Sequence, residues 1–435
     1  MKQKRILIIS HNPINTTDNM GKTLGNIFSG FDEKELCQLY FREQNVEAKN
    51  CENFFCIDDV SMVKSVINRF YKTGKIVKNN TIIKTTNEAK EEIFQKGRKR
   101  TGSIYILRNL LWKIGKWNTK ELEGWLKEMK PSAIFFAAGD YTFAFNIAQK
   151  ISKTKNIPLY IYCTDEFYRK NLGKETIANR IYKNRYRKIF RNSIKNSKTY
   201  FTITENMLEF YEKEFGKKGK VLMNSTDIQP MGDIEYRTKK TFNISYIGNL
   251  GYDRWKNIIE IKDVIDRVNN ETSTKYKFKV YSGEKNKEVL NMIKDKLKDD
   301  YCGAISKEEV IRKMKETDIL IHTENFENTN KEKVKYSLST KIPDILASQR
   351  LMLAYGPREI ASIQYIEKNN VGIIAGSNSE LESKLKELVE KKINVEEILK
   401  RAKDLVEKQH RIDGIYKMLY ETMMGEKNEK NNFTD

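Results

Sequence analysis

Residues 242–257 read FNISYIGNLGYDRWKN. A short apolar run comes first, a turn with two glycines follows, and a helical pattern begins near Arg254 and Lys256. This order is typical of a βα unit, the repeating element of a parallel sheet. Two cations beside the start of a helix also favour a diphosphate ligand, because the helix N-terminus itself attracts anions. The segment therefore predicts both the opening of an α/β domain and a phosphate site.

Strand-sized apolar runs alternate with helical patterns on both sides of this segment. Seven runs precede it, at 5–10, 36–42, 53–58, 133–139, 158–165, 198–204 and 220–225, and five follow it, at 276–283, 301–305, 318–324, 351–357 and 371–376. The polar stretch 226–241 separates the two series. We therefore predict an α/β protein with two doubly wound, Rossmann-like domains that face a cleft.

The same alternation gives the expected domain boundaries in the 435-residue chain. A length of this order fits two or three domains. We expect an N-terminal domain, a C-terminal domain, a C-terminal helix that returns to the first domain and a disordered tail, at 1–230, 241–405, 406–424 and 425–435 respectively.

A second glycine turn, DNMGKTLGN at 18–26, contains the GKT of an ATP-binding P-loop. A P-loop requires another glycine five residues before Gly21, and Thr16 stands there instead. The loop in front is also long and polar. We therefore expect a turn suited to a phosphate or a sugar, and neither an ATPase nor a kinase.

Cysteine and histidine usage argues against disulfides and metal sites. The five cysteines include no C-x-x-C pair, which is typical of buried thiols in a reducing compartment. His11, His322 and His410 are far apart, and the chain has no D-x-D motif, so we expect no metal and no cofactor. The apolar runs are strand-sized and the N-terminus lacks a signal-peptide core, which favours a cytoplasmic location.

The net charge of +21 is concentrated in the N-terminal half. Residues 1–240 hold 45 Lys and Arg against 26 Asp and Glu, whereas the rest of the chain holds 35 against 33. The basic charge of the N-terminal half predicts an acidic partner: nucleic acid, anionic lipid or a phosphorylated acceptor. A Lys-rich genome composition would explain many of these lysines, but it would not explain their uneven distribution.

Two segments of the first half have surfaces suited to anions. SIYILRNLLWKIGKW at 103–117 has an apolar side with a basic edge and follows the KGRKR of 96–100. Either it lies in a membrane interface, or it is an ordinary core helix beside a solvated basic loop. The basic, Tyr-containing pattern at 179–198 suits phosphates or solvent.

Polar residues follow four strands of the second half, at the edge where α/β sheets bind ligands. The first such loop is the glycine turn that begins with Gly248 and Asn249. In KYSLSTKIPDILAS, the backbone near Ser339 and Thr340 and the Lys341 ammonium can hold phosphate, and Asp344 can accept from a ribose diol. GAISKEEV (303–310) suits a base, and HTENF (322–326) places Glu324 at a strand end. Helix caps and solvated charges would explain each loop alone. Together they describe a nucleotide-diphosphate pocket.

These motifs occur in a particular order with others: SHNP, NTTDNMGKTL, IYCTDEFY, TENM, MNSTD, GNLGYDRWKN, LSTKIPDILAS and LAYGP. In this respect the chain resembles GT-B glycosyltransferases of the GT4-like group, in the branch that builds bacterial surface polysaccharides. The resemblance covers almost the whole chain. It implies a nucleotide-diphosphate sugar donor bound mainly by the C-terminal domain and an acceptor bound by the N-terminal domain.

The resemblance also implies roles for single residues. The family's phosphate-binding cation matches Arg254, with Lys256 as a near alternative. The second acidic residue of the family's E-x7-E pattern, which binds ribose, matches Asp344. The first falls on Tyr336, which is not acidic, and Glu324 is the expected substitute.

Three further loops of the family can be placed on this chain. The base-recognition loop matches Gly303, Ala304 and Ile305, up to Ser306. The N-terminal glycine loop that approaches donor and acceptor matches Gly21. The family's His-Asp loop is represented by Thr164 and Asp165, so its histidine is absent.

Arg254, Lys341 and a helix N-terminus would stabilise the departing diphosphate without a metal ion. The resemblance implies retention of the anomeric configuration, and His11 and Asp165 would be the base candidates if the enzyme inverted. We expect a hexosyltransferase-type enzyme that acts on a glycan or a lipid-diphosphate-linked acceptor, with peripheral attachment to the inner membrane face as a hypothesis. The alternatives are a non-catalytic scaffold, a nucleotide-sugar epimerase and, from another class, a nucleic-acid-binding protein.

Overall fold

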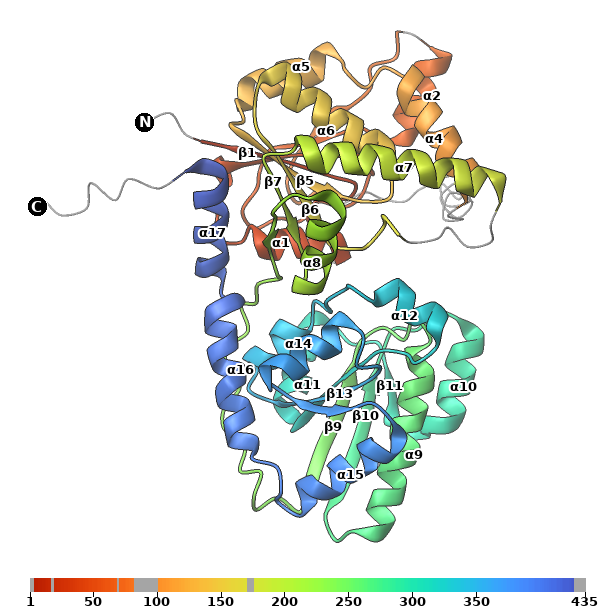
Figure 1. Cartoon of the computed structure of the whole chain (residues 1–435), viewed down its shortest axis with the longest axis vertical. Helices are drawn as coiled ribbons and strands as arrows, with labels where there is room; N and C mark the ends of the chain where they lie inside the picture. The colour runs from red at the N-terminus through yellow and green to blue at the C-terminus, as the bar shows by residue number, and fades with distance from the viewer. Residues whose placement is uncertain (1–3, 17–18, 69, 82–100, 170–175, 426–435) are drawn as a thin grey trace, which may run out of the picture. The chain divides into compact units, whose positions relative to one another are not determined.

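The computed structural model describes residues 4–16, 19–68, 70–81, 101–169 and 176–425 (Figure 1). The KGRKR segment and residues 426–435 of the predicted tail lie outside these ranges. The chain divides into two compact units. Residues up to Asn224 and those from Ile412 onward form the first unit, and Ser225–Arg411 form the second.

The first unit is built on an eight-stranded sheet with the order β4-β3-β2-β1-β5-β6-β7-β8. All neighbours are parallel except β3 and β4, which are antiparallel. The strands are β1 (Ile6–Ser10), β2 (Leu36–Tyr40), β3 (Phe54–Cys56), β4 (Lys75–Val77), β5 (Ala133–Ala138), β6 (Leu159–Cys163), β7 (Thr199–Thr202) and β8 (Lys220–Val221). The central strands β1, β5 and β6 are buried along their whole length, as expected for strands with helices on both faces.

Local sequence signals explain where the helices of this unit begin. The side chains of Asp58, Thr119, Thr176 and Thr204 accept hydrogen bonds from the first turns of α2, α5, α7 and α8, and so act as N-caps. The described helices before the second unit are α1 (Asn19–Ile27), α2 (Asp59–Ile67), α4 (Gly102–Ile114), α5 (Lys120–Met129), α6 (Thr142–Lys155), α7 (Ile177–Asn196) and α8 (Glu205–Phe215), with a short 3-10 helix at Glu33–Glu35.

At the edges of this sheet, one strand was missed and one predicted strand was too long. Strand β4 was not predicted, because a three-residue strand that begins with Lys75 and is followed by Lys78 carries no apolar alternation. The strand predicted at 220–225 is only two residues long. Leu222 and Met223 are buried, but they lie outside the ladder. Burial without strand pairing therefore explains the second error.

The second unit contains a six-stranded parallel sheet with the order β11-β10-β9-β12-β13-β14. Its strands are β9 (Thr241–Ile247), β10 (Lys275–Tyr281), β11 (Tyr301–Gly303), β12 (Ile319–Thr323), β13 (Leu351–Tyr355) and β14 (Ile373–Ala375). This is the doubly wound order of Rossmann-like domains, in which the direction of strand addition reverses between the first and fourth strands. The prediction of two doubly wound α/β domains is confirmed.

Helices of the second unit cover this sheet in chain order. They are α9 (Arg254–Glu271), α10 (Lys287–Leu297), α11 (Lys307–Glu316), α12 (Asn328–Val334), α13 (Ile342–Ala347), α14 (Ala361–Asn369), α15 (Asn378–Val389) and α16 (Val395–Gln409), with a 3-10 turn at Lys298–Asp300. The core of the unit lies between β9, β10, β12 and β13 and the apolar face of α9. Within the described ranges, no helix is long and apolar enough to cross a membrane.

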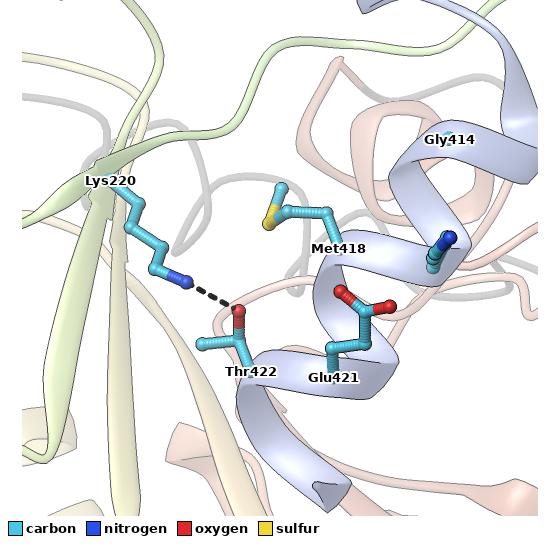
Figure 2. A pocket seen from close by; sticks show the side chains of 6 residues that line it. Lys220, Gly414, Met418, Glu421 and Thr422 are labelled. Carbon is cyan, nitrogen blue, oxygen red and sulfur yellow. Dashed lines mark hydrogen bonds between the residues drawn. The ribbon is translucent and has the colours of Figure 1, made fainter. Parts of the chain in front are cut away.

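The last described helix, α17 (Ile412–Met424), belongs to the first unit, although it follows the whole of the second in sequence. Its Tyr416 ring meets Phe31 edge-on at 4.7 Å between ring centres. The Thr422 carbonyl accepts from the Tyr160 hydroxyl at 3.0 Å. The Thr422 hydroxyl accepts from Lys220 at 2.9 Å (Figure 2). A hollow of about 410 Å3 lies beside these contacts, lined by Lys220, Gly414, Lys417, Met418, Glu421 and Thr422.

Replacing a buried residue of α17 tests its contribution to the first unit. Leu419 is fully buried, so Leu419→Ala is expected to lower the free energy of unfolding by about 2–5 kcal/mol through lost packing and the cavity that remains. Lys417→Ala, on the exposed side of the same helix, is expected to change it by less than about 0.5 kcal/mol. Urea unfolding followed by circular dichroism compares the two. Equal effects would mean that α17 is not part of the folded core.

Candidate functional site

The two sheets each have a point at which neighbouring strands lead to helices on opposite sides, and ligands of open α/β sheets bind there. In the second unit this point lies between β9 and β12. The chain leaves β9 through Gly248–Asp253 and enters α9 at Arg254. It leaves β12 at Thr323 and continues through Glu324. The predicted donor residues on these two loops are therefore brought together.

Arg254 and Glu324 form a buried, bidentate ion pair. The Nη2 atom of Arg254 lies 2.9 and 2.8 Å from the two carboxylate oxygens of Glu324, and its Nε lies 3.0 Å from the second of them. Only 15% of the arginine side chain and 5% of the glutamate side chain are exposed. The Nε group also donates to the Thr323 carbonyl at 3.1 Å. These contacts fix the orientation of the guanidinium plane beside the turn between β9 and α9.

The outer nitrogen of Arg254, Nη1, faces solvent. It donates to the Asn249 side chain at 3.1 Å and lies 3.4 Å from the Gly251 carbonyl. Burial acts to lower the pKa of Arg254, but the charge of the Glu324 carboxylate and the hydrogen bonds that it accepts from the guanidinium outweigh burial and raise this pKa. Arg254 is thus a fixed cation with one solvent-facing edge.

The backbone of this turn is held in an unusual conformation. Tyr252 and Asp253 both have a φ of +56°, in the left-handed region that side chains other than glycine rarely adopt. Two asparagines, one in the loop after β12 and one in α12, hold the turn in place. Asn325 donates to the Asp253 carbonyl at 3.1 Å, and Asn330 donates to the Asp253 carboxylate at 2.9 Å. Asp253 does not cap α9 with its side chain, so this helix N-terminus lacks the usual capping contact.

Lys341 reaches the same turn from the start of α13. Its ammonium donates to the Ile247 carbonyl at 2.7 Å and lies 5.6 Å from the centre of the Tyr246 ring. A Cβ added to Gly248 would collide with this ammonium. Glycine at 248 is therefore what allows Lys341 to lie against the backbone between β9 and α9.

His322, at the end of β12, is buried beside these charges. Its Nε2 lies 3.0 Å from the Ser362 hydroxyl and 4.0 Å from a Glu324 oxygen. Burial, reinforced by the positive charges of Arg254 and Lys341, lowers the pKa of His322 to about 3. Burial raises the pKa of Glu324, and Arg254 opposes this rise. His322 is therefore neutral at physiological pH and adds no cation to the site.

The remaining donor residues predicted for this unit lie along the same edge of the sheet. Gly303 ends β11 with a φ of +76°, and Ala304 lies beside Gly283, which follows β10. Ser339 and Thr340 immediately precede α13. Ile305 lies between Gly303 and the start of α11. The predicted base loop thus follows β11, which β10 separates from β9, and the segment with Ser339 and Thr340 lies between α12 and α13.

Two predicted residues have contacts that the sequence did not indicate. One oxygen of Asp344 accepts from the Thr226 hydroxyl at 2.7 Å, which ties α13 to the segment after β8. Lys256 forms an exposed ion pair with Glu327 of the loop before α12. Lys256 therefore points along α9 toward that loop, while Arg254 faces Glu324.

The predicted residues of the first unit follow different strands of its sheet. His11 comes directly after β1, and its ring lies 4.6 Å from the Tyr141 ring, which follows β5. Asp165 is exposed and follows β6, with β5 between it and His11. Both residues lie at the carboxyl edge of the sheet, and Tyr141 is the aromatic neighbour that the sequence did not single out.

Gly21 lies within α1, and not in the loop that precedes this helix. A Cβ at Gly21 would come within 2.5 Å of the Asn15 side chain and 2.6 Å of the Pro13 carbonyl. Local packing therefore explains why residue 21 is a glycine, because the absence of a side chain allows the loop after β1 to fold back onto α1.

Asn257 is a site residue that sequence reasoning missed. It is buried one turn after Arg254, and its amide donates to the Thr323 hydroxyl and to the Glu324 carbonyl, both at 2.9 Å. Its spacing of three residues from Arg254 places both on one face of α9. That spacing was the available signal. Among the described residues, no group of three or more His, Cys, Asp or Glu side chains is arranged to hold a metal ion.

Comparisons with known proteins give structural matches only. No protein-family model matches the chain, and no curated protein matches it by sequence. TarM superposes with a TM-score of 0.60 at 11% identity, and HepE from Anabaena in complex with UDP with a TM-score of 0.59 at 10% identity. Sucrose-phosphate synthase from Thermosynechococcus elongatus gives 0.57 at 9%. Each match covers 97% of this chain and 99% of the other. The chain has the GT-B fold.

A comparison of the wild type with the variant His322→Gln tests whether His322 is buried in its neutral form. Native His322 stays neutral, whereas the unfolded chain takes up a proton as the pH falls through 6.5, so stability is lost between pH 6.5 and about 3. Glu324 acts in the opposite sense in both proteins. His322→Gln is expected to remove the histidine part, which has a slope of up to about 1.4 kcal/mol per pH unit. Urea unfolding from neutral pH downward measures it, and identical pH profiles would contradict the buried neutral imidazole.

Proposed function

We propose that this protein is a glycosyltransferase that uses a nucleotide-diphosphate sugar. The observation that carries the proposal is the pair of cations, Arg254 and Lys341, that meets the N-terminus of α9 where strand order reverses in the second unit. Such a site suits a diphosphate, because backbone N–H groups and cations can there bind the same anion. The similar HepE structure contains UDP, which supports the same ligand class for this fold.

The proposed division of roles follows the edge of the sheet. The solvent-facing Nη1 of Arg254 and the ammonium of Lys341 bind the diphosphate. The loop from Gly303 to Ile305 receives the base. Asp344 receives the ribose, because its Thr226 contact uses one oxygen and a carboxylate can accept several hydrogen bonds.

Glu324 was expected to replace the missing acidic residue at Tyr336 and to touch the donor. Its two oxygens instead face the Arg254 guanidinium. We therefore assign Glu324 a positioning role: it orients Arg254, whose fixed charge is then available when the diphosphate departs. Preorganised charge of this kind costs no rearrangement at the moment of reaction.

The finer assignment concerns the acceptor and the stereochemistry. We propose a glycan acceptor carried on a lipid diphosphate at the inner face of the cell membrane, as in surface polysaccharide synthesis. The basic first unit and the loops after β1 and β6, which hold His11 and Asp165, support this choice. Transfer is proposed to retain the anomeric configuration and to need no metal ion.

Nucleotide binding tests the donor site directly. In a thermal-shift panel of UDP, GDP, dTDP, ADP and CMP, one nucleotide is expected to stabilise the protein, by about 2.7 kcal/mol at a hundred times its dissociation constant. Lys341→Met and Gly248→Ala are each expected to weaken binding at least about tenfold, because both remove the ammonium from the turn. Lys315→Met, an exposed lysine at the end of α11, is the matched control.

No shift with any nucleotide at millimolar concentration would argue against the donor site. Equal affinities for the wild type and both site variants would show that the nucleotide binds elsewhere. Binding without any turnover would favour the non-catalytic scaffold, and interconversion of the sugar nucleotide without an acceptor would favour an epimerase.

Transfer itself tests the stereochemistry and the metal requirement. With the sugar conjugate of the bound nucleotide, the product anomer seen by NMR is expected to match that of the donor, and the rate to be unchanged by EDTA. Removing Arg254 alone would leave a buried carboxylate unpaired, which destabilises proteins by about 3–5 kcal/mol. The double variant Arg254→Ala/Glu324→Ala avoids this and is expected to lose transfer. An inverted product, or full activity of the double variant, would contradict the assignment.

A further inference from the structure

Helix α4 exposes apolar side chains along the side that faces away from the core. Leu107, Leu110 and Ile114 are 68%, 51% and 59% exposed, and their spacing of three and four residues places them on one face. Tyr105 and Trp112 are buried on the opposite face. The helix is therefore apolar on two sides. The core-helix interpretation of this segment explains only the buried side.

Two of the helices that pack against α4 show the same pattern. On α2, Val60, Val63 and Ile67 are 41%, 44% and 81% exposed, again three and four residues apart. On α7, Ile177 and Ile181 are 78% and 56% exposed. Helix α4 packs against both α2 and α7 (Figure 1). The exposed apolar residues of α2, α4 and α7 together form what we name the apolar ridge. The surfaces of soluble monomeric proteins seldom carry neighbouring apolar faces of this kind unless a partner binds there.

The charges on the same helices are almost all positive. The three helices contain ten basic residues: Lys64, Arg108, Lys113, Arg180, Lys183, Arg185, Arg187, Lys188, Arg191 and Lys195. Their one carboxylate, Asp59, lies 3.0 Å from the Arg108 guanidinium and pairs with it. Lys183 is buried and Arg191 pairs with Glu214 of α8. The exposed basic residues of the three helices are Lys64, Lys113, Arg180, Arg185, Lys188, Arg191 and Lys195. The exposed charge on the helices of the apolar ridge is therefore mainly positive.

We propose that the apolar ridge is a membrane-docking surface that inserts its Leu, Ile and Val side chains into the interface of an anionic bilayer. Apolar residues gain from burial among the lipid chains, while Lys and Arg around them gain from negative headgroups. The two parts of the surface therefore fit the two parts of one lipid leaflet. This docking surface does not depend on the assignment of the donor site.

Other partners fit this surface less well. A second copy of the chain would place the same basic helices opposite one another across a two-fold interface, with like charges in contact. A nucleic acid would neutralise the cations, but would leave Leu107, Leu110 and Ile114 without apolar contacts. Anionic lipid supplies both kinds of contact.

Vesicle flotation tests the proposal. The full chain is expected to float with vesicles of phosphatidylglycerol and phosphatidylcholine, to float less at high salt and to remain unbound with phosphatidylcholine alone. Leu107→Ser/Leu110→Ser/Ile114→Ser is expected to weaken binding at least about tenfold. Lys64→Glu/Lys113→Glu is expected to weaken it mainly at low salt. The matched control, Met292→Ser/Ile311→Ser, alters exposed apolar residues of the second unit and is expected to bind like the wild type.

Circular dichroism and the nucleotide thermal shift show whether each variant remains folded. Failure of the wild type to float with anionic vesicles would overturn the proposal, as would equal flotation of the triple variant. A wild-type dimer that becomes a monomer in the triple variant would assign the ridge to self-association instead.

Discussion

The parallel direction of all six strands in the sheet of the second unit is the constraint on which the site depends. It places every carboxyl end of β9–β14 at one edge, and the reversal of strand order between β9 and β12 leaves a gap between their following loops. Arg254 and Glu324 are 70 residues apart in sequence, yet they pair because their strands are neighbours. The left-handed backbone at Tyr252 and Asp253 is held by loops that meet at the same edge.

The electrostatics of the site follow from burial. Two cations and one carboxylate meet there, while burial keeps His322 neutral beside them. A protonated imidazole would compete with Arg254 and Lys341 for Glu324 and would repel both. Its neutrality leaves the carboxylate to orient the arginine, so the charge that faces solvent is positive and fixed. Such a site attracts an anion without first having to rearrange.

The sequence predicted the architecture well because apolar runs and turns are local signals. It predicted Arg254 and Glu324 as separate ligands, since nothing in a one-dimensional pattern shows that residues so far apart form an ion pair. Asn257 was not predicted, because the sequence does not distinguish a buried amide from an exposed polar residue of a helix. Gly21 looked like part of a ligand loop, but its neighbours Asn15 and Pro13 give it a packing reason. Strand β4 was too short to carry any pattern.

The place of α17 in the first unit has a consequence for biosynthesis. The chain leaves this unit after Asn224, builds the whole second unit and returns only at Ile412. A ribosome therefore delivers all residues of the second unit before it delivers the helix that contacts Phe31 and Tyr160. Domains usually fold in the order of synthesis. Here the unit that begins first is completed last, and until then the surface that α17 covers stays open to chaperones.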